Sequence, residues 1–314
     1  HSYPENYTFA RGAMEMALGR GGDQAVVKSG EEMTFYGGKI QHGERTTRVK
    51  SRMKAQAMRE LILSMDNVLI MGHAMTDMDS FGAAIGVYRA SRTVEKPGHI
   101  VLGDLNSNIR GWVTAFRESK DYDSGMFFTH EQAIAMADEN TVVIVVDTNR
   151  ASIVECPALL KKTDQIVVFD HHRQAGDAIS KAVLFYIEPF ASSACEMVAE
   201  ISEYIGNGLR LTAAEAEAMY AGIMIDTNYF SNKTGVRTFE AMAYLRRNGA
   251  DAVRVRKAFR DDLTEYKIKA AAIQDTELYL GEYAIAESSA KGVESPTVLG
   301  AKIAKIGRAS CRER

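Results

Sequence analysis

Five short apolar runs with helical stretches between several of them constrain the fold of this chain most. The runs are "NVLIM" (67–71), "HIVL" (99–102), "TVVIVV" (141–146), "QIVVF" (165–169) and "AVLFYI" (182–187). Continuous runs rich in β-branched residues, separated by helices, indicate strands that are buried on both faces of a parallel sheet. The sequence therefore predicts an α/β fold, a mainly parallel sheet with helices on both faces.

Composition narrows the class of protein. The chain has 314 residues and a net charge of −3, a length that suits about two domains. This mild acidity argues against binding of duplex nucleic acid through bulk positive charge, but it is compatible with a small nucleotide substrate. The cysteines form no C-x-x-C pair, which disfavours a zinc knuckle or disulfide scaffold and indicates a reducing compartment. No apolar run reaches the roughly 18 residues of a membrane helix, so we expect a soluble chain.

Carboxylates and imidazoles follow the predicted strands at their carboxyl ends. Seven such residues come after the first, third and fourth runs: His73, Asp77, Asp79, Asp147, Asp170, His171 and His172. An eighth, Asp226, is the last residue of the segment "AGIMID" (221–226). In an open parallel sheet the ligand crevice lies outside the carboxyl ends of the strands. We therefore expect these side chains to converge on one site.

Mixed carboxylate and imidazole ligands suit a borderline divalent cation such as Mn²⁺, and the absence of thiolates disfavours structural zinc. The number of acids suggests two ions, which at roughly 3.5–4 Å apart generate a hydroxide nucleophile and neutralise phosphate charge. One carboxylate must then bridge them. A single strand-end Asp is more often a turn or helix cap, and only the ordered set of four blocks is specific. We interpret Ser192, Ser193 and Glu196 as a helix cap, and we expect surface or packing roles for His42, His99 and His130.

The four blocks "GHAMTDMDS", "VVDT", "FDHHR" and "GIMIDT" resemble, in that order, the DHH phosphoesterase superfamily. Within it the chain is similar to the cyclic-di-AMP phosphodiesterases of the GdpP (YybT) type, because "ARGAMEMALGRGGDQAVVK" resembles the end of their degenerate GGDEF domain. The resemblance implies that His73 and Asp77 bind a first metal ion, that Asp147 bridges two ions, and that Asp79, His171 and Asp226 bind the second. It also implies that His172 faces the phosphate and that Asp170 orients a neighbouring histidine.

The same resemblance implies a domain organisation. We expect the end of a degenerate GGDEF domain at 1–43, a helical linker at 44–65, a DHH domain at 66–260, and a linker helix with the truncated start of a DHHA1 domain at 261–305. The segment "IGRASCRER" (306–314) has the sequence of a translated sequencing adapter, and we expect it to be an artefact. The glycine-rich GGGH motif, with which DHHA1 domains bind substrate, does not occur in the chain. We therefore expect this chain to bind Mn²⁺ but to hydrolyse cyclic-di-AMP poorly. Members of this type are bacterial membrane proteins with cytoplasmic catalytic domains, so we expect a homodimer whose only membrane attachment is through N-terminal helices absent from this sequence.

The resemblance predicts a metal-dependent phosphodiesterase that hydrolyses cyclic-di-AMP to the linear dinucleotide pApA with two Mn²⁺ ions. A nanoRNase that degrades short oligonucleotides and a manganese pyrophosphatase are alternatives within the superfamily, and the GGDEF-like segment counts against both. A nucleotide sensor without turnover is the alternative from another class. Intact ligands in every block count against it, because a sensor does not need two ions and a bridging acid.

Overall fold

The computed structural model describes residues 3–19, 24–29, 32–37, 43–174, 176–206, 209–259, 263–279, 283–287, 299–300 and 303–304. The predicted artefact segment 306–314 and His42 lie outside these residues. The chain divides into two compact units, His1–Met53 and Lys54–Arg314. The first unit contains helix α1 (Tyr3–Gly19) and an antiparallel hairpin of β1 (Gln24–Ser29) and β2 (Glu32–Gly37). Helix α2 (Gly43–Ser64) follows the hairpin in the sequence.

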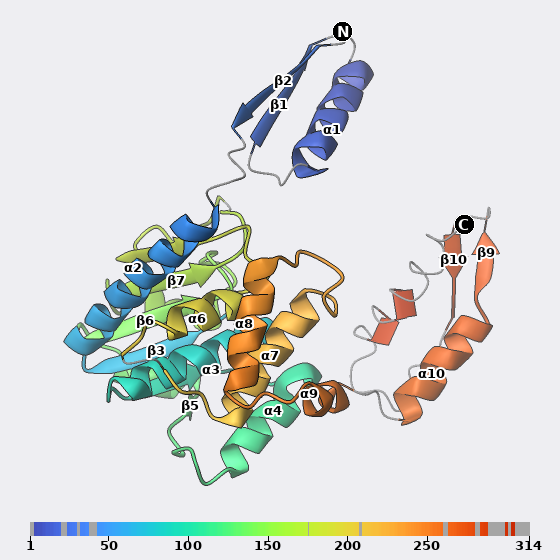
Figure 1. Ribbon diagram of the computed structural model, residues 1–314. Coiled ribbons are helices and arrows are strands. Elements are labelled where there is room, and N and C mark those ends of the chain that lie inside the picture. The colour runs from blue at the N-terminus through green and yellow to red at the C-terminus, as the bar shows by residue number, and fades with distance from the viewer. Residues whose placement is uncertain are drawn as a thin grey trace. The chain divides into compact units, whose positions relative to one another are not determined.

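The second unit is built on a six-stranded sheet in which every neighbouring pair is parallel (Figure 1). The strand order is β5-β4-β3-β6-β7-β8. The strands are β3 (Asn67–Met71), β4 (Gly98–Val101), β5 (Phe127–Phe128), β6 (Thr141–Val146), β7 (Ile166–Asp170) and β8 (Leu184–Ile187). The predicted α/β class and parallel sheet are confirmed, whereas the two-residue strand β5 was not predicted.

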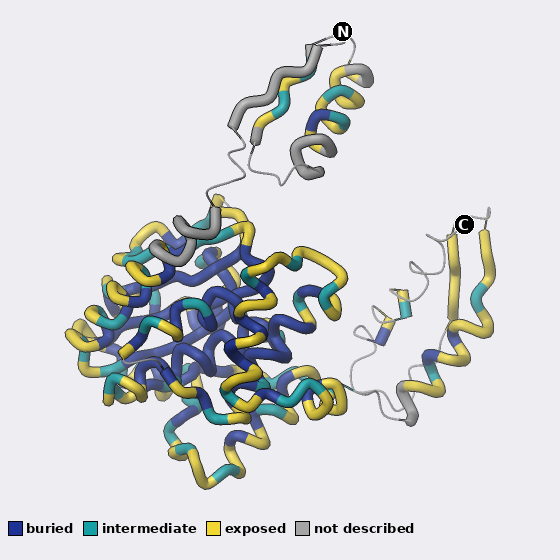
Figure 2. The backbone as a smooth tube through the Cα atoms, in the orientation of Figure 1, coloured by how far each residue is buried: buried dark blue, intermediate teal, exposed yellow. Residues whose placement is uncertain are grey.

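Side chains of the central strands alternate between two cores, one on each face of the sheet. Ile70 and Ile144 belong to the larger core together with buried residues of α2, α3, α6 and α7. Leu69 and Val143 belong to the smaller core with residues of α5. The period of two along a strand sends successive side chains to opposite faces. Both faces are therefore buried, which explains why the strands are continuously apolar (Figure 2).

Helices α3 to α9 come after β3 in the sequence of the second unit. They are α3 (Met78–Thr93), α4 (Ser107–Glu118), α5 (His130–Met136), α6 (Ala194–Ser202), α7 (Ala213–Asp226), α8 (Val236–Arg247) and α9 (Ala252–Ala258). Thr212 and Glu215 form a reciprocal capping box at the start of α7, as the T-x-x-E spacing indicates. Asp77 caps α3 by accepting hydrogen bonds from the main-chain N–H groups of Asp79 and Ser80, both at 3.0 Å. The first turn of α3 therefore begins inside the first sequence block, "GHAMTDMDS" (72–80).

Helices α3 and α7 pack closely because two glycines face each other's helix. A Cβ atom on Gly82 would lie 2.7 Å from the Ala218 carbonyl oxygen, and one on Gly222 would lie 2.8 Å from the Met78 carbonyl oxygen. Both would also contact Cys195 Sγ of α6 at 2.7 and 2.5 Å. Only a hydrogen atom fits in place of a side chain at these contacts. Glycine at positions 82 and 222 therefore allows the start of α3 to approach the end of α7.

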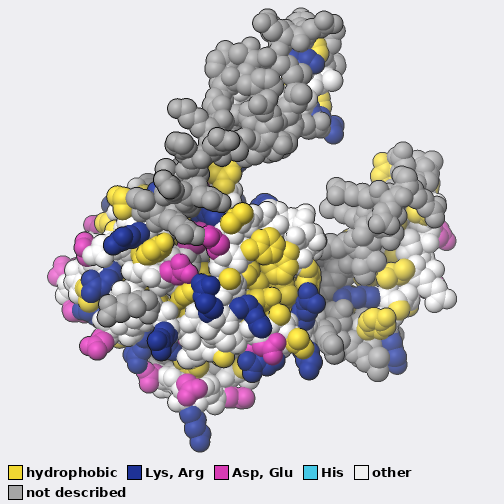
Figure 3. Space-filling model, in the orientation of Figure 1, with side chains coloured by type: hydrophobic (Ala, Val, Ile, Leu, Met, Phe, Trp, Pro, Cys, Tyr) yellow, Lys and Arg dark blue, Asp and Glu magenta, His cyan; other side chains and the backbone are white. Residues whose placement is uncertain are grey.

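The remaining elements complete the described chain. Helix α10 (Leu263–Gln274) is followed by β9 (Glu277–Tyr279) and β10 (Tyr283–Ile285), which pair antiparallel. No helix among the described residues is long and apolar enough to cross a membrane. Exposed hydrophobic side chains gather near the end of α7 and the start of α8 (Figure 3), where Tyr229, Val236 and Phe239 are exposed.

Candidate metal centre

The predicted ligand residues meet at the carboxyl edge of the sheet in three overlapping groups of three, the third of which is Asp147, His171 and His172. The first group is His73, Asp77 and Asp147. Nε2 of His73 lies 3.7 Å from Asp77 Oδ1 and 3.4 Å from Asp147 Oδ2. These side chains come from the loop after β3 and from the end of β6, which are adjacent strands. One imidazole nitrogen and two carboxylate oxygens thus surround a common point.

The second group is Asp79, His171 and Asp226. Nε2 of His171 lies 3.8 Å from Asp79 Oδ2 and 3.7 Å from Asp226 Oδ2. These residues come from the first turn of α3, the end of β7 and the last position of α7. The close packing of α3 on α7 brings the two acids to the same histidine, although they are far apart in the sequence.

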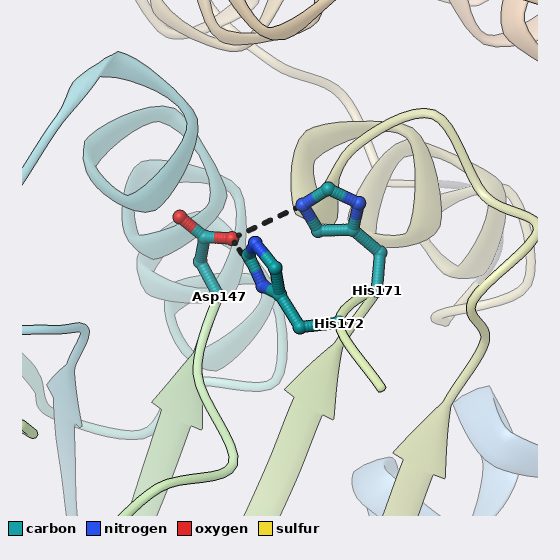
Figure 4. Close-up of side chains that lie close together, drawn as sticks. All are labelled: Asp147, His171 and His172. Atoms are coloured by element: carbon teal, nitrogen blue, oxygen red, sulfur yellow. Dashed lines mark ion pairs between the residues drawn. The ribbon is translucent and has the colours of Figure 1, made fainter. Parts of the chain in front are cut away.

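Asp147 belongs to the first group and also contacts His171 of the second. While its Oδ2 atom faces His73, its Oδ1 atom lies 3.4 Å from His171 Nε2 (Figure 4). Asp147 is buried and has a φ of 59°, in the left-handed region that non-glycine residues rarely adopt. Its N–H still donates to the Phe169 carbonyl at 2.8 Å, which extends the pairing of β6 with β7. The left-handed residue turns the chain at the strand end, and such strain is common at functional sites.

The distances between these nitrogen and oxygen atoms suit coordination of a divalent cation better than direct hydrogen bonding. Separations of 3.4–3.8 Å between imidazole nitrogen and carboxylate oxygen are too long for good hydrogen bonds. Ligand atoms that each lie about 2.1 Å from a shared ion are themselves about 3.0–3.5 Å apart. Two buried oxygens, Asp147 Oδ1 and Asp226 Oδ2, have no hydrogen-bond partner within the described residues. A cation would satisfy both, so these acidic and histidine groups could hold metal.

Without metal, the crowded acids hold protons at the site. Burial opposes protonation of His73, but Asp147 and Asp77 outweigh it and raise its pKa to about 10. Burial likewise opposes protonation of His171, and Asp147, Asp79 and Asp226 raise its pKa to about 9. Burial, and then the Asp147 charge, raise the pKa of Asp79 well above its usual value. A divalent cation would compete with these protons for the same atoms.

Main-chain N–H groups at the start of α6 hold Asp79. Its Oδ2 atom accepts from Ala194 N–H at 2.6 Å and its Oδ1 atom from Cys195 N–H at 2.9 Å. Ser193 caps this helix by accepting from the Glu196 N–H at 3.0 Å, which confirms the predicted cap. The positive end of α6 thus compensates part of the buried charge of Asp79.

His172 and Asp170 form a separate pair at the end of β7. Asp170 Oδ1 accepts from His172 Nδ1 at 2.8 Å and from the His172 N–H at 3.1 Å, while Asn149 Nδ2 donates to its Oδ2 at 2.5 Å. The hydrogen bond to Asp170 raises the pKa of His172, whose side chain is exposed. His172 Nδ1 also lies 3.7 Å from Asp147 Oδ1 (Figure 4), but the shorter contact to Asp170 determines where its proton lies.

Sequence reasoning did not find Asn149 or Glu155, and it gave His130 only a surface or packing role. Glu155 accepts a 2.7 Å hydrogen bond from His130 Nε2. Asn149 follows Asp147 by two residues in "DTN", which is the only local signal for it. The ring of His99 stacks on Phe128 with 3.9 Å between ring centroids, in agreement with the packing role expected for it.

Two relatives are similar to this chain over most of its length. The chain is 42% identical over 275 residues to a protein of Geobacillus thermodenitrificans named "Cyclic-di-AMP phosphodiesterase GdpP". It is 35% identical over 298 residues to "Cyclic-di-AMP phosphodiesterase PdeA" of Listeria monocytogenes. These alignments cover 87% and 94% of this chain but 42% and 45% of the relatives, so the chain spans less than half of their length.

A solved structure and a family match identify the fold and the family. The structure of an exopolyphosphatase-related protein from Bacteroides fragilis has a TM-score of 0.62 at 17% identity and covers 74% of this chain and 67% of its own. This likeness concerns the fold alone. Residues 67–223, half of the chain, match the family described as "DHH family, N-terminal domain", and this segment contains the first three of the four sequence blocks. The chain therefore belongs to the DHH family.

Proposed function

We propose that the centre binds two Mn²⁺ ions. His73 and Asp77 hold the first ion, Asp79, His171 and Asp226 hold the second, and Asp147 is shared by both. The observation that carries this proposal is the position of Asp147, whose two oxygens face different histidines at 3.4 Å each. Carboxylate and imidazole donors without thiolate favour Mn²⁺ over structural Zn²⁺.

The proposed reaction is hydrolysis of a phosphodiester in cyclic-di-AMP to give pApA. Support comes from two relatives named as cyclic-di-AMP phosphodiesterases, which match both the DHH segment and the residues before it. Residues 1–43 are proposed as the end of a degenerate GGDEF domain, 66–260 as the DHH domain and 261–305 as the start of a DHHA1 domain. A homodimer is part of the same proposal.

Bound cations supply an activated water and neutralise negative charge on the phosphate oxygens. The residues of the chain hold and orient the reacting groups. Asp170 keeps a proton on His172 Nδ1, which leaves Nε2 of the exposed ring as the atom that contacts the phosphate. The raised pKa of His172 favours its cationic form, which donates a hydrogen bond to a phosphate oxygen. Asp147, in the left-handed turn at the end of β6, directs one carboxylate oxygen toward His73 and the other toward His171.

A turnover assay with Mn²⁺ tests the proposal. The purified chain is incubated with cyclic-di-AMP, with pApA and with pyrophosphate, and kcat/KM is measured for each. We expect the highest value for cyclic-di-AMP, with pApA accumulating as product. Preference for pApA would indicate the short-oligonucleotide activity, and preference for pyrophosphate the pyrophosphatase. Tight binding of cyclic-di-AMP without product would indicate a sensor.

A further inference from the structure

Glu155 is a buried carboxylate outside the sequence blocks that predicted the metal centre. It lies on the loop after β6, and its side chain is 7% exposed. Its Oε1 atom accepts hydrogen bonds from the Gly103 N–H at 2.9 Å and from His130 Nε2 at 2.7 Å. Its Oε2 atom lies 3.3 Å from the Thr76 hydroxyl. Donors from the loop after β3, the loop after β4 and the first residue of α5 thus converge on one carboxylate.

The main chain on either side of Val154 fixes the loop that carries His73. The Glu155 N–H donates to the Gly72 carbonyl at 2.8 Å, and the Ala74 N–H donates to the Ile153 carbonyl at 2.8 Å. His73 and Val154 form an isolated antiparallel bridge between these two bonds. The backbone position of His73 is therefore set by residues 153–155.

Thr76 connects the Glu155 side chain to the other ligand of this loop. Its hydroxyl lies 3.0 Å from the His73 carbonyl oxygen and 3.3 Å from Glu155 Oε2, so its single proton is shared between the two acceptors. Asn106 Nδ2 also donates to the Thr76 carbonyl at 2.6 Å. Asp77 is the next residue. The loop from His73 to Asp77 is thus held at both ends. Glu155 contributes its main-chain N–H at the first end and its carboxylate, through Thr76, at the second.

We propose that Glu155 is a positioning residue for the first cation. It holds His73 and Asp77 at the separation that lets them share one ion with Asp147, and the inference rests on the proposed two-cation centre. The second group depends on the starts of α3 and α6 and the ends of β7 and α7. Among the described residues, Glu155 forms its hydrogen bonds with Gly72, Thr76, Gly103 and His130, which lie outside these elements. Loss of Glu155 should therefore weaken one site selectively, by the 10- to 100-fold that is typical when a supporting partner is removed.

Gly103 offers an independent way to move the same carboxylate. A Cβ atom there would lie 2.6 Å from Glu155 Oε1 and 3.1 Å from His130 Nε2. Alanine at this exposed position must displace the Glu155 side chain, while Glu155 and every proposed ligand remain present. Gly111 on α4 is the matched control, because a Cβ atom there meets nothing within 4 Å.

Each site can be measured separately with Mn²⁺ alone. Asp226→Asn weakens the second site and Asp77→Asn the first, and the asparagine at 77 can still cap α3. Titration followed by the electron paramagnetic resonance signal of free Mn²⁺ then gives the dissociation constant of the remaining site. Adding Glu155→Ala should weaken the site that remains in Asp226→Asn by about 10- to 100-fold. It should change the site that remains in Asp77→Asn by less than about twofold, well below that range.

Two further variants and one control complete the test. Glu155→Gln retains an acceptor oxygen for Gly103 and His130, so it should restore most of the affinity that alanine loses. Gly103→Ala should weaken the first site and Gly111→Ala should not, which decides the question even if Glu155→Ala fails to fold. Two ions in the parent with normal first-site affinity in both Glu155→Ala and Gly103→Ala would overturn the inference, as would equal weakening of both sites. Fewer than two ions in the parent would instead refute the two-cation centre itself.

Discussion

Asp170 holds His172 through two hydrogen bonds, one at 2.8 Å to the ring atom Nδ1 and one at 3.1 Å to the main-chain N–H. The acid is fully buried, whereas the imidazole is exposed. A buried acceptor therefore determines the tautomer and the orientation of a ring that faces solvent. This pair depends on local sequence, since the two residues are separated by one position, but its effect reaches the proposed phosphate.

Asp170→Asn should lower turnover by about 100-fold, within the range of general acid–base effects. The hydrogen bond to Asp170 raises the pKa of His172, so its loss lowers that pKa. The cationic form of His172 then loses its proton at a lower pH. In the pH profile of kcat/KM, the decrease at high pH should therefore begin at a lower pH than in the parent. Measurement of kcat/KM against pH checks this. An unshifted decrease, or loss of Mn²⁺ binding, would contradict the assigned role.

Asp147→Asn should remove nearly all turnover and weaken Mn²⁺ at both sites, because asparagine offers one neutral oxygen in place of two charged ones. We expect a loss in kcat of at least about 100-fold, with the fold retained by circular dichroism. Asp164→Asn is the control, since the Asp164 side chain is 83% exposed. Activity within about tenfold of the parent, or 1.4 kcal/mol of barrier, would show that Asp147 is not shared.

The free energy of unfolding of the metal-free protein should fall as pH rises from about 6.5 toward 9–10. His73 and His171 have pKa values of about 10 and 9 in the folded chain and ordinary values when unfolded. In this window the folded state binds more protons than the unfolded state, so rising pH favours unfolding. With Mn²⁺ present the trend should weaken or reverse, because cations and protons compete.

Urea unfolding at several pH values, after treatment with a chelator and again with Mn²⁺ restored, tests this linkage. Asp147→Asn removes an acid that raises both histidine pKa values and should flatten the metal-free slope. A metal-free stability that stays constant or increases across the window would disprove the proton-holding state of the cluster.

Arg89→Met should destabilise the fold by about 3 kcal/mol, because it leaves a buried carboxylate without its cation. Glu215 is fully buried and receives hydrogen bonds from Arg89 Nε and Nη2 at 2.6–2.9 Å, which join α3 to α7. Arg92→Met is the matched control, since its partner Asp123 is largely exposed, and it should cost less than about 1 kcal/mol. Equal losses in urea unfolding would contradict this ranking.

Local sequence signals were sufficient for five of the six strands of the parallel sheet and for the residues at their ends. The runs that form β3, β6 and β7 are long and continuously apolar because both sheet faces are covered, and the ligand-type residues follow them directly. Strand β5 is only Phe127–Phe128, too short for any periodicity to indicate. The linker helix predicted after residue 260 ends at Gln274, and a short strand follows it.

Contacts between distant segments could not be predicted in this way. The N–H groups at Ala194 and Cys195 that bind Asp79 become visible only when α6 is placed against α3. Glu155 lies in no motif, and its partners Thr76, Gly103 and His130 come from three other segments of the chain. A supporting network of this kind depends on tertiary geometry, whereas a ligand motif depends on short spacing.

The parallel pairing of β3 with β6 has a consequence for biosynthesis. Val68 is opposite Val142, so β4, β5 and three helices emerge from the ribosome between the two partners. Asp226, at the end of α7, emerges later still. At about 5–20 residues per second, translation from the first ligand to the last takes roughly 8–30 s. The first group is complete only after Asp147 has been synthesised, and the second only after Asp226. The full set of proposed ligands is therefore assembled late and cannot nucleate folding during synthesis.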